Sequence, residues 1–398
     1  MKILYLTSRF PYPLEKGDKL RVYHHIKALH ALGHEVVLCA LNDAPVDEEM
    51  QAALSPFCAA IHVLPLSKWN FIKRIPAWFF QAYPIQLGFF WKGDMANKIK
   101  AIAAATQPDL VWTQLIRMSD YSKNLPYFKV LDIMDTLSAN TLRWAENKDT
   151  NFFLRFILHR EAKLLKAYEA KIMKAYDANF IISQQDAALL PAQPNNLHVL
   201  PNGVDSNYFD KNAVLHLYKP DQQYDIVFVG NMGYAPNVAA AQYLITQIMP
   251  LLWQKYPNLK VLLAGARPSA EVQDLSKHPL VSVSGWIDDI REAYLNAKMM
   301  IAPLFIGSGQ QNKILEAMAM SLPCITTTLV NNAIGAKHEE SLFIADDAMT
   351  FAKYASQLLE NKNKSAQIAQ TACAFVRNNY SWNAHVQHIM ATILAINK

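Results

Sequence analysis

Short apolar runs alternate with amphipathic stretches along the chain, beginning at its first residues. The run Lys2–Thr7 has the composition of a buried strand, and a proline-rich loop follows it. Asp18 can cap the next segment, a helix whose apolar positions share one face and which Gly33 ends before a second strand at Glu35–Ala40. A strand, a helix and a strand in this order predict a parallel sheet with helices on both faces.

Similar units repeat in two series, which are separated near Pro201. In the first series we expect further strands at Ile61–Leu64, Leu110–Trp112, Lys129–Ile133 and Ala178–Ile182. In the second series we expect strands at Ile226–Gly230, Lys260–Gly265, Val281–Ser284, Met299–Pro303 and Pro323–Thr327.

This repetition predicts an α/β fold of two Rossmann-like, doubly wound parallel-sheet domains that face a central cleft. We expect the domains to cover residues 1–203 and 204–379, with a closing helix at 380–398 that packs back on the first domain. The polar stretch Lys211–Gln223 is expected to be a linker. A long charged helix between Phe152 and Tyr176 is most simply interpreted as presenting a solvated face.

Composition narrows the class of protein. The chain has 398 residues, of which 52% are hydrophobic, enough for two domains with sizeable cores. Its four cysteines form no CxxC motif, which excludes a disulfide scaffold or a zinc finger and fits a reducing compartment. No apolar run resembles a signal peptide or a spanning helix, so we expect a cytoplasmic protein. The net charge of +5 lies entirely in residues 1–200 and is too small to argue for nucleic acid.

The segment from Gly307 to Met320 is the most informative for chemistry. Gly307, Ser308, Gly309 and Gln310 form a loop between a strand and a helix, where backbone N–H groups can approach an anion. Lys313 adds a positive charge in the first helical turn. Glu316 lies on the same side and can accept hydrogen bonds from a diol such as a ribose. These residues form a candidate nucleoside-diphosphate site; the alternative is an ordinary turn with a solvent-exposed Lys–Glu pair.

A second candidate anion site lies at the start of the first helix. Gly17 allows close approach of a ligand, and Lys19 and Arg21 carry positive charge. The alternative is a purely structural cap by Asp18. Adjacent histidines farther along this helix face different ways, and nothing else has metal-ligand spacing, so no metal site is predicted.

Residues 66–92 are rich in aromatic side chains interleaved with four Lys and Arg residues. Aromatic groups at the interface and cations against anionic lipid suggest a peripheral membrane contact. The alternative interpretation is that the aromatic residues belong to the core between strands.

Several segments in order resemble the family 4 retaining glycosyltransferases, which have the two-Rossmann GT-B fold. The resemblance covers essentially the whole chain and includes bacterial sugar transferases of exopolysaccharide operons, among them the exosortase-associated type. The matching segments are Leu200–Asp205 with Tyr208-Phe209, Val229-Gly230, Leu263–Gly265, Val283–Asp289, Ala302–Leu304, Glu316–Ala319 with Leu322–Thr326, and Tyr380–Trp382.

The resemblance implies a nucleotide-sugar-dependent enzyme that retains anomeric configuration without an obligatory cofactor or metal. The donor would be a UDP- or GDP-sugar bound by the second domain, and the first domain would bind a saccharide or lipid-linked acceptor. Lys313 and the 307–309 amides would stabilise the leaving diphosphate, together with Lys19 or Arg21. Glu316 would hold the ribose. Gly230, Asn231 and Gln310 would line the phosphates, and Gly265 and the backbone near Trp286 and Ile287 would receive the base.

The chain departs from the family pattern at three points. Ser308 stands where the first Glu of the family pair is usual, which leaves the donor sugar open. Asn231 replaces the usual Arg or Lys, and Lys313 can supply that charge instead. The family often carries a histidine near the sugar in the first domain, but the corresponding stretches here have none; Gln114, Asp132 or Asp135 could contact the sugar or the acceptor.

Three alternatives remain at this stage. A sugar-nucleotide 2-epimerase also uses two such domains but needs acid–base carboxylates and histidines. A degenerate GT-B protein could serve as a nucleotide-sugar scaffold or sensor, for which only Ser308 and Asn231 argue. A nucleic-acid-modifying transferase would need a basic stripe, which the neutral second half does not supply.

Overall fold

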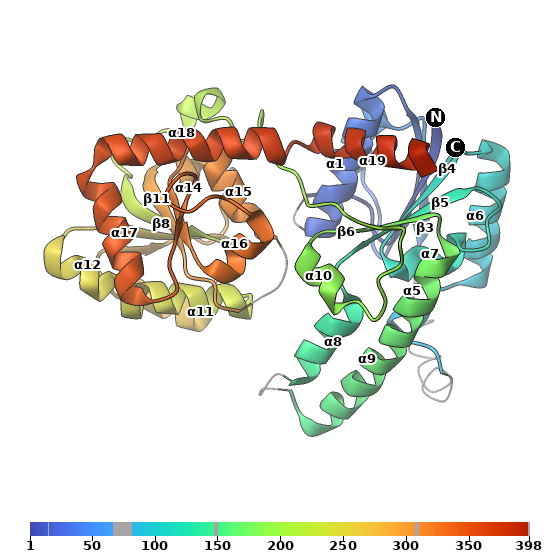
Figure 1. The fold of residues 1–398 in the computed structure, drawn as a ribbon, viewed down its shortest axis with the longest axis horizontal. Coiled ribbons are helices and arrows are strands. Elements are labelled where there is room, and N and C mark those ends of the chain that lie inside the picture. The colour runs from blue at the N-terminus through green and yellow to red at the C-terminus, as the bar shows by residue number, and fades with distance from the viewer. Residues whose placement is uncertain (15, 67–81, 147–149, 307–309, 397–398) are drawn as a thin grey trace. The chain divides into compact units, whose positions relative to one another are not determined.

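A computed structural model describes residues 1–396 except 15, 67–81, 147–149 and 307–309. The chain divides into two compact units, one of Met1–Pro201 with Trp382–Lys398 and the other of Asn202–Ser381. Each unit is a parallel sheet with helices packed against it (Figure 1). No helix among the described residues is long and apolar enough to cross a membrane.

The first unit is built on a seven-stranded sheet of order β3-β2-β1-β4-β5-β6-β7, in which every neighbouring pair is parallel. The strands are β1 (Lys2–Thr7), β2 (Glu35–Asn42), β3 (Ala60–Pro65), β4 (Leu110–Gln114), β5 (Phe128–Met134), β6 (Ala178–Ile181) and β7 (Leu197–Val199). Its α-helices are α1 (Gly17–Ala31), α2 (Glu48–Ala52), α5 (Ile85–Phe90), α6 (Gly93–Thr106), α7 (Ser119–Ser122), α8 (Leu137–Glu146), α9 (Phe152–Ile172), α10 (Gln184–Leu189) and α19 (Trp382–Ile396). Short 3₁₀ helices cover Ser55–Phe57, Ile116–Met118 and Met173–Ala175.

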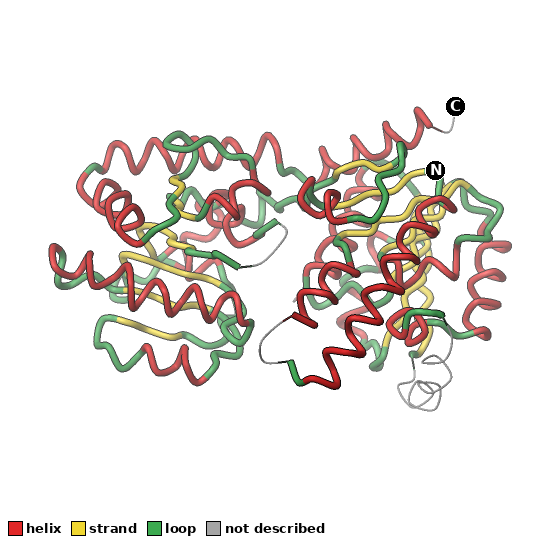
Figure 2. The backbone as a smooth tube through the Cα atoms, turned by 60° about the horizontal axis from the view of Figure 1, so that its bottom comes forward, coloured by secondary structure: helices red, strands yellow, loops and turns green. Residues whose placement is uncertain are grey.

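The second unit contains a six-stranded parallel sheet of order β10-β9-β8-β11-β12-β13. The strands are β8 (Tyr224–Val229), β9 (Val261–Ala264), β10 (Val281–Val283), β11 (Ala297–Ala302), β12 (Cys324–Thr326) and β13 (Phe343–Ile344). Its α-helices are α11 (Ala235–Tyr243), α12 (Met249–Lys255), α13 (Ala270–Leu275), α14 (Arg291–Leu295), α15 (Asn312–Ala319), α16 (Thr328–Ile334), α17 (Ala348–Glu360) and α18 (Lys362–Asn379). A π-helical segment, Leu244–Ile248, joins α11 to α12. Figure 2 shows helices packed against the strands in this unit.

The strand orders confirm the predicted doubly wound α/β fold. In each sheet the chain first builds outward from a central strand and then returns to its other side, between β1 and β4 and between β8 and β11. The strands β7 and β13 have three and two residues and were not expected, because such short segments leave little pattern in a sequence.

The C-terminal helix α19 belongs to the first unit, where it packs against α1. Val386, Ile389 and Ile393 of α19 are fully buried in the same apolar cluster as Val22 and Ile26 of α1. The burial of these aliphatic side chains is the main contribution holding the helix in place.

One sequence interpretation is wrong, and a second holds only for its basic residues, because Lys163, Lys166 and Lys171 of α9 are exposed. The stretch Lys211–Gln223 is folded, not a linker: it begins with a 3₁₀ helix, Lys211–Leu217, and the Asn296 side chain hydrogen-bonds the backbone of Leu217 and Lys219. The acidic residues of α9 do not face solvent either.

Glu161 and Glu169 are almost fully buried in the first unit. Glu161 accepts hydrogen bonds from the backbone N–H groups of Ile85 and Gln86, at 2.9 and 2.8 Å. Glu169 accepts one from the backbone N–H of Ser138, at 2.9 Å. These N–H groups lie in the first turns of α5 and α8, where backbone N–H groups have no acceptor within their own helix. Each carboxylate of α9 therefore caps the N-terminus of another helix.

Candidate functional site

The carboxyl ends of β8 and β9 approach each other closely in the second unit. Gly230, the residue after β8, donates its N–H to Ala264 at 2.9 Å. Gly265, the residue after β9, has φ +138°, and a Cβ there would lie 1.8 Å from the Gly230 carbonyl oxygen. Only glycine fits this position, because both the space and the backbone conformation exclude a side chain.

Lys313 points to this same place from the first turn of α15. Its ammonium donates a hydrogen bond of 2.6 Å to Asn237 Oδ1, and a Cβ on Gly230 would lie 3.1 Å from its Nζ. Asn237 in turn donates to the backbone carbonyl of Asn231 at 2.9 Å. Burial lowers the pKa of Lys313 to about 8, with Glu316 acting in the opposite direction. The protein therefore holds a poorly solvated cation where an anionic ligand would be favoured.

Glu316 lies one turn farther along α15 and accepts a 2.9 Å hydrogen bond from the Tyr294 hydroxyl. Tyr294 is buried, so this bond fixes the orientation of the carboxylate. Burial raises the pKa of Glu316, while the Tyr294 hydrogen bond and the charge of Lys313 oppose that shift. The alternative interpretation, a solvent-exposed Lys–Glu pair, does not describe these two residues, because both have defined partners.

The other predicted donor-binding residues have different surroundings. Gln310 uses its side-chain amide on the backbone of Asn202, accepting from the N–H and donating to the carbonyl, each at 2.8 Å. Asn231 accepts a 3.1 Å hydrogen bond from Gly233 N–H. Trp286 is exposed and donates through Nε1 to Asp288 at 2.9 Å, whereas Ile287 packs against the apolar core. Gly307, Ser308 and Gly309 lie outside the described residues.

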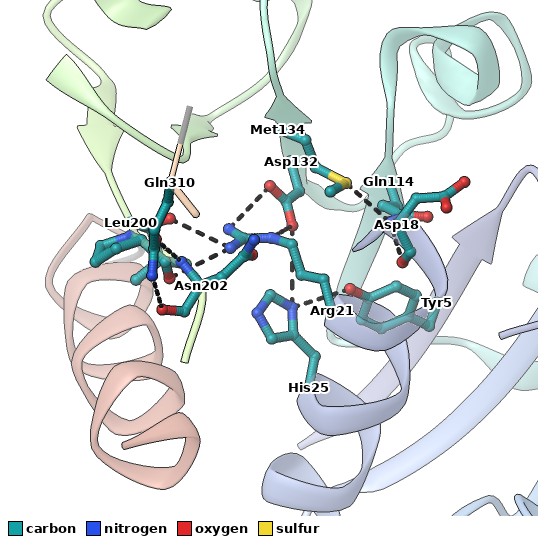
Figure 3. Close-up of polar contacts among 11 residues, drawn as sticks. Tyr5, Asp18, Arg21, His25, Gln114, Asp132, Met134, Leu200, Asn202 and Gln310 are labelled. Atoms are coloured by element: carbon teal, nitrogen blue, oxygen red, sulfur yellow. Dashed lines mark hydrogen bonds and ion pairs between the residues drawn. The ribbon is translucent and has the colours of Figure 1, made fainter. Parts of the chain in front are cut away.

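In the first unit, Arg21 is buried rather than available to a ligand. Its Nε donates to Asp132 Oδ2 at 2.7 Å and its Nη2 to Oδ1 at 3.1 Å, and both side chains have no exposed surface. Its Nη1 also donates to the carbonyls of Leu200 and Pro201, at 3.2 and 3.3 Å. Figure 3 shows the Arg21 side chain lying between Asp132 and the backbone at Leu200. We therefore assign Arg21 a positioning role in place of direct contact with phosphate.

The start of α1 differs from the sequence expectation. Lys16, not Asp18, occupies the N-cap position, and Asp18 pairs with Arg9 at 2.7 Å. Lys19 donates through Nζ to the Tyr12 carbonyl at 3.0 Å. Gly17 begins the helix, and a side chain there would meet nothing within 4 Å.

Gln114 is the last residue of β4, and Asp135 follows the neighbouring strand β5. Gln114 is buried and donates to the Asp18 carbonyl at 2.8 Å. Asp135 is partly exposed and accepts from Asn140 Nδ2 at 2.7 Å. Burial, and secondly the charge of Asp186, raises the pKa of Asp135. Asp135 is therefore the more accessible of the two groups.

Two family models match the chain. Residues 19–208 match the model described as Glycosyltransferase Family 4, and residues 223–361 match the model described as Glycosyl transferases group 1. The chain belongs to the glycosyltransferases.

A relative of this glycosyltransferase in Klebsiella pneumoniae is described as an uncharacterized 44.6 kDa protein in the cps region. The two are 20% identical over 403 residues, which cover 95% of this chain and 96% of the relative.

Solved structures confirm the GT-B architecture of the glycosyltransferase. Sucrose-phosphate synthase from Thermosynechococcus elongatus matches with a TM-score of 0.70 and 16% identity, over 100% of this chain and 99% of that one. Anabaena HepE in complex with UDP matches with a TM-score of 0.67 and 15% identity, over 99% and 100%. The same HepE protein in complex with UDP-glucose gives a TM-score of 0.65 and 14% identity, over 99% and 100%.

Asn237 and Tyr294 were not identified from the sequence of the glycosyltransferase. Each holds the functional group of a predicted residue, Lys313 or Glu316, yet neither lies in a segment that resembles the family. Asn237 is seven residues beyond Gly230 on α11, and Tyr294 is on α14. Only the folded sheet brings them to α15.

Proposed function

We propose that this glycosyltransferase takes its sugar from a UDP- or GDP-linked donor and transfers it with retention of configuration to a saccharide or lipid-linked acceptor. The observation that carries the proposal is the group around Gly230, in which Lys313 presents a poorly solvated cation and Glu316 a carboxylate held by Tyr294. The HepE complexes with UDP and UDP-glucose, and the relative from a cps region, support the choice of donor and a role in cell-surface polysaccharide synthesis.

In this proposal the diphosphate binds beside Gly230, whose missing side chain lets Asn237 and Lys313 approach the backbone closely. Lys313 neutralises the charge that develops on the leaving diphosphate as the bond to the sugar breaks. Asn237 holds the ammonium in position before the donor arrives, so little reorganisation is needed. Because burial has already removed much of the water around Lys313, a phosphate oxygen restores favourable contacts that the free enzyme lacks.

Glu316 accepts hydrogen bonds from the two ribose hydroxyls of the donor. Tyr294 donates to one carboxylate oxygen of Glu316 and so fixes the orientation of the other, which we assign to the ribose. We assign the backbone near Trp286 and Gly265 to the base. In the first unit, Asp135 and Gln114 are assigned to the acceptor.

The test is a thermal-shift titration of the wild-type protein with UDP, GDP and ADP and with the 2′-deoxy form of whichever nucleotide binds. We expect one base to stabilise the protein by about 2.7 kcal/mol at a hundredfold excess over its Kd. The 2′-deoxy form should bind about tenfold more weakly to the wild type. The Glu316→Gln variant should bind the ribose and 2′-deoxy forms equally, because the carboxylate that accepts the hydrogen bond of the 2′-hydroxyl is absent.

A second measurement separates an enzyme from a binding protein. Incubation with the sugar form of the nucleotide that binds should release free nucleoside diphosphate, and Lys313→Met should abolish release. If configuration is retained, the anomeric proton of the product glycoside should show the coupling constant of the same anomer, α or β, as the donor sugar. Absence of any thermal shift with all three nucleotides would contradict the proposal, and binding without turnover would favour the scaffold alternative.

A further inference from the structure

Helices α8 and α9 form an antiparallel hairpin that extends away from the sheet of the first unit (Figures 1 and 2). Among the described residues, the distal end of this hairpin carries large apolar side chains that are exposed. On α9, Phe152, Phe153 and Phe156 are 87%, 73% and 61% exposed, and on the last turn of α8 Trp144 is 55% exposed. Exposed aromatic residues gathered at one end of an element indicate an interaction surface.

The exposed residues of α9 follow the helical repeat. Phe152 and Phe156 are four residues apart and share one side of the helix with His159, Lys163 and Lys166, all of which are exposed. The opposite side, which includes Leu158, Ala162 and Leu165, is buried against the first unit. One stripe therefore runs from aromatic side chains at the distal end to basic side chains nearer the domain.

Within α9, which is described in full, this stripe contains no exposed carboxylate, whereas Glu146 at the end of α8 is exposed. The two acidic residues of α9, Glu161 and Glu169, are buried and bind backbone N–H groups of α5 and α8. Lys163 lies seven residues from Phe156, which is roughly 10 Å along the helix. That distance is about one Debye length at physiological salt, so Lys163 acts on charges placed just above the level of the aromatic rings, and Lys166, three residues farther along α9, acts on them more weakly.

We infer that the α8–α9 hairpin docks on an anionic membrane surface through Phe152, Phe153 and Phe156. Phenylalanine rings suit the boundary between headgroups and acyl chains, and the lysines above them suit anionic headgroups. Phe152 and Phe156 lie about one helical turn, roughly 6 Å, apart, which is within the depth of about 5–10 Å to which interfacial helices bury their apolar side. The charge pattern favours this partner over a second copy of the chain, whose own hairpin would bring like charges together.

This surface is distinct from the aromatic segment expected at 66–92. Most of that segment, residues 67–81, lies outside the described residues, whereas α9 is described in full. The inference does not rest on the proposed donor, because vesicle binding is measured without any nucleotide.

The experiment is flotation of the full-length protein with vesicles of neutral phosphatidylcholine, or of the same lipid containing anionic phosphatidylglycerol. We expect binding to the anionic vesicles and little to the neutral ones. The triple variant Phe152→Gln, Phe153→Gln, Phe156→Gln keeps good helix formers at exposed positions, so the fold should persist. It should bind at least about tenfold more weakly, since each ring contributes to the buried apolar area.

Two further variants sharpen the result. Lys163→Gln with Lys166→Gln should lower affinity for anionic vesicles about tenfold or more and leave neutral vesicles unaffected. Met349→Gln, at a 77% exposed position on α17 of the second unit, is the matched control and should bind like wild type. Circular dichroism and melting of each variant check that it is folded.

Three outcomes would overturn the inference. They are failure of the wild type to bind anionic vesicles, equal binding by the folded triple variant, and equal binding to neutral and anionic vesicles. A concentration-dependent dimer that the triple variant disperses, with no vesicle binding, would assign the surface to a second copy instead.

Discussion

Arg21 and Asp132 form a two-point ion pair in the interior of the first unit, 111 residues apart in sequence and with no exposed surface on either side chain. The same guanidinium donates to the carbonyls of Leu200 and Pro201, the last residues before the second unit begins. Asp132 also lies 3.9 Å from His25 Nδ1. Burial, and secondly Arg21, holds the pKa of His25 well below its usual range, so this ring is neutral and Arg21 is the cation that balances the carboxylate.

Asp132→Asn should destabilise the first unit by about 3–5 kcal/mol, because it leaves the Arg21 guanidinium buried without a counter-charge. Urea unfolding followed by circular dichroism measures the change. The double variant Arg21→Met, Asp132→Leu should recover most of the loss, since neither charge then remains. Lys2→Ala, which breaks an exposed pair with Glu35, is the control and should change stability by about 0–1 kcal/mol. A loss below about 1 kcal/mol for Asp132→Asn would show that the pair does not hold the fold.

Affinity for UDP, one of the two proposed donor nucleotides, should depend on the protonation of Lys313, and the same dependence is expected for GDP. Its pKa in the free protein is about 8, so the ammonium is present below that pH and is lost as the pH rises through it. A bound diphosphate favours the charged form, and UDP affinity should therefore weaken by up to about tenfold per pH unit above pH 8. Isothermal titration between pH 7 and 9.5 tests this. Lys313→Met should bind weakly at every pH in the range; an inflection retained in that variant would assign the titration to another group.

Lys313 should lower the free energy of unfolding of the protein without bound nucleotide. Its folded pKa lies below its unfolded pKa, so the protonated form is disfavoured by folding, fully so below pH 8 and progressively less as the pH rises toward 10.5. Lys313→Met should raise the free energy of unfolding at pH 7 by about 1–2 kcal/mol, a value reduced from the full pKa shift because Lys313 is partly exposed. Stabilisation combined with lost donor binding is expected of a residue kept for function. Destabilisation at pH 7 would show a structural role instead.

Gly265 should tolerate no side chain. Gly265→Ala combines φ +138° with a Cβ that would lie 1.8 Å from the Gly230 carbonyl oxygen, so the ends of β8 and β9 must separate. We expect a loss of at least about 3 kcal/mol, together with loss of UDP binding, because Gly230 lines the proposed diphosphate position. Gly335→Ala is the matched control: φ is +69° and nothing lies within 4 Å, so only backbone strain of about 1–2 kcal/mol applies. Equal losses for the two variants would rule out the close approach as the cause.

The sequence was sufficient to predict the two parallel sheets, because buried strands and amphipathic helices leave a regular apolar pattern. It also placed Lys313 and Glu316 on one side of a helix, since their spacing alone determines that. It could not show that Asn237 and Tyr294 would hold these groups, because those contacts join residues 76 and 22 positions apart. Arg21 was misjudged for the same reason: a cation near a glycine looks available until its distant carboxylate is known.

Glu161 illustrates the limit most directly and supplies a further test. From the sequence, a charged residue within α9 is expected to be exposed. Glu161 instead caps the N-terminus of α5 by accepting two backbone N–H hydrogen bonds, of 2.9 and 2.8 Å. Glu161→Ala should destabilise the first unit by about 2–3 kcal/mol, since two N–H groups lose their partner. Lys163→Ala, two residues away and exposed, should stay within about 0.5 kcal/mol of wild type. Urea unfolding measures the free energy of unfolding of both variants. Equal losses would show that Glu161 contributes no more to stability than an exposed charge does. The burial of the acidic side of α9 would then not be a source of stability.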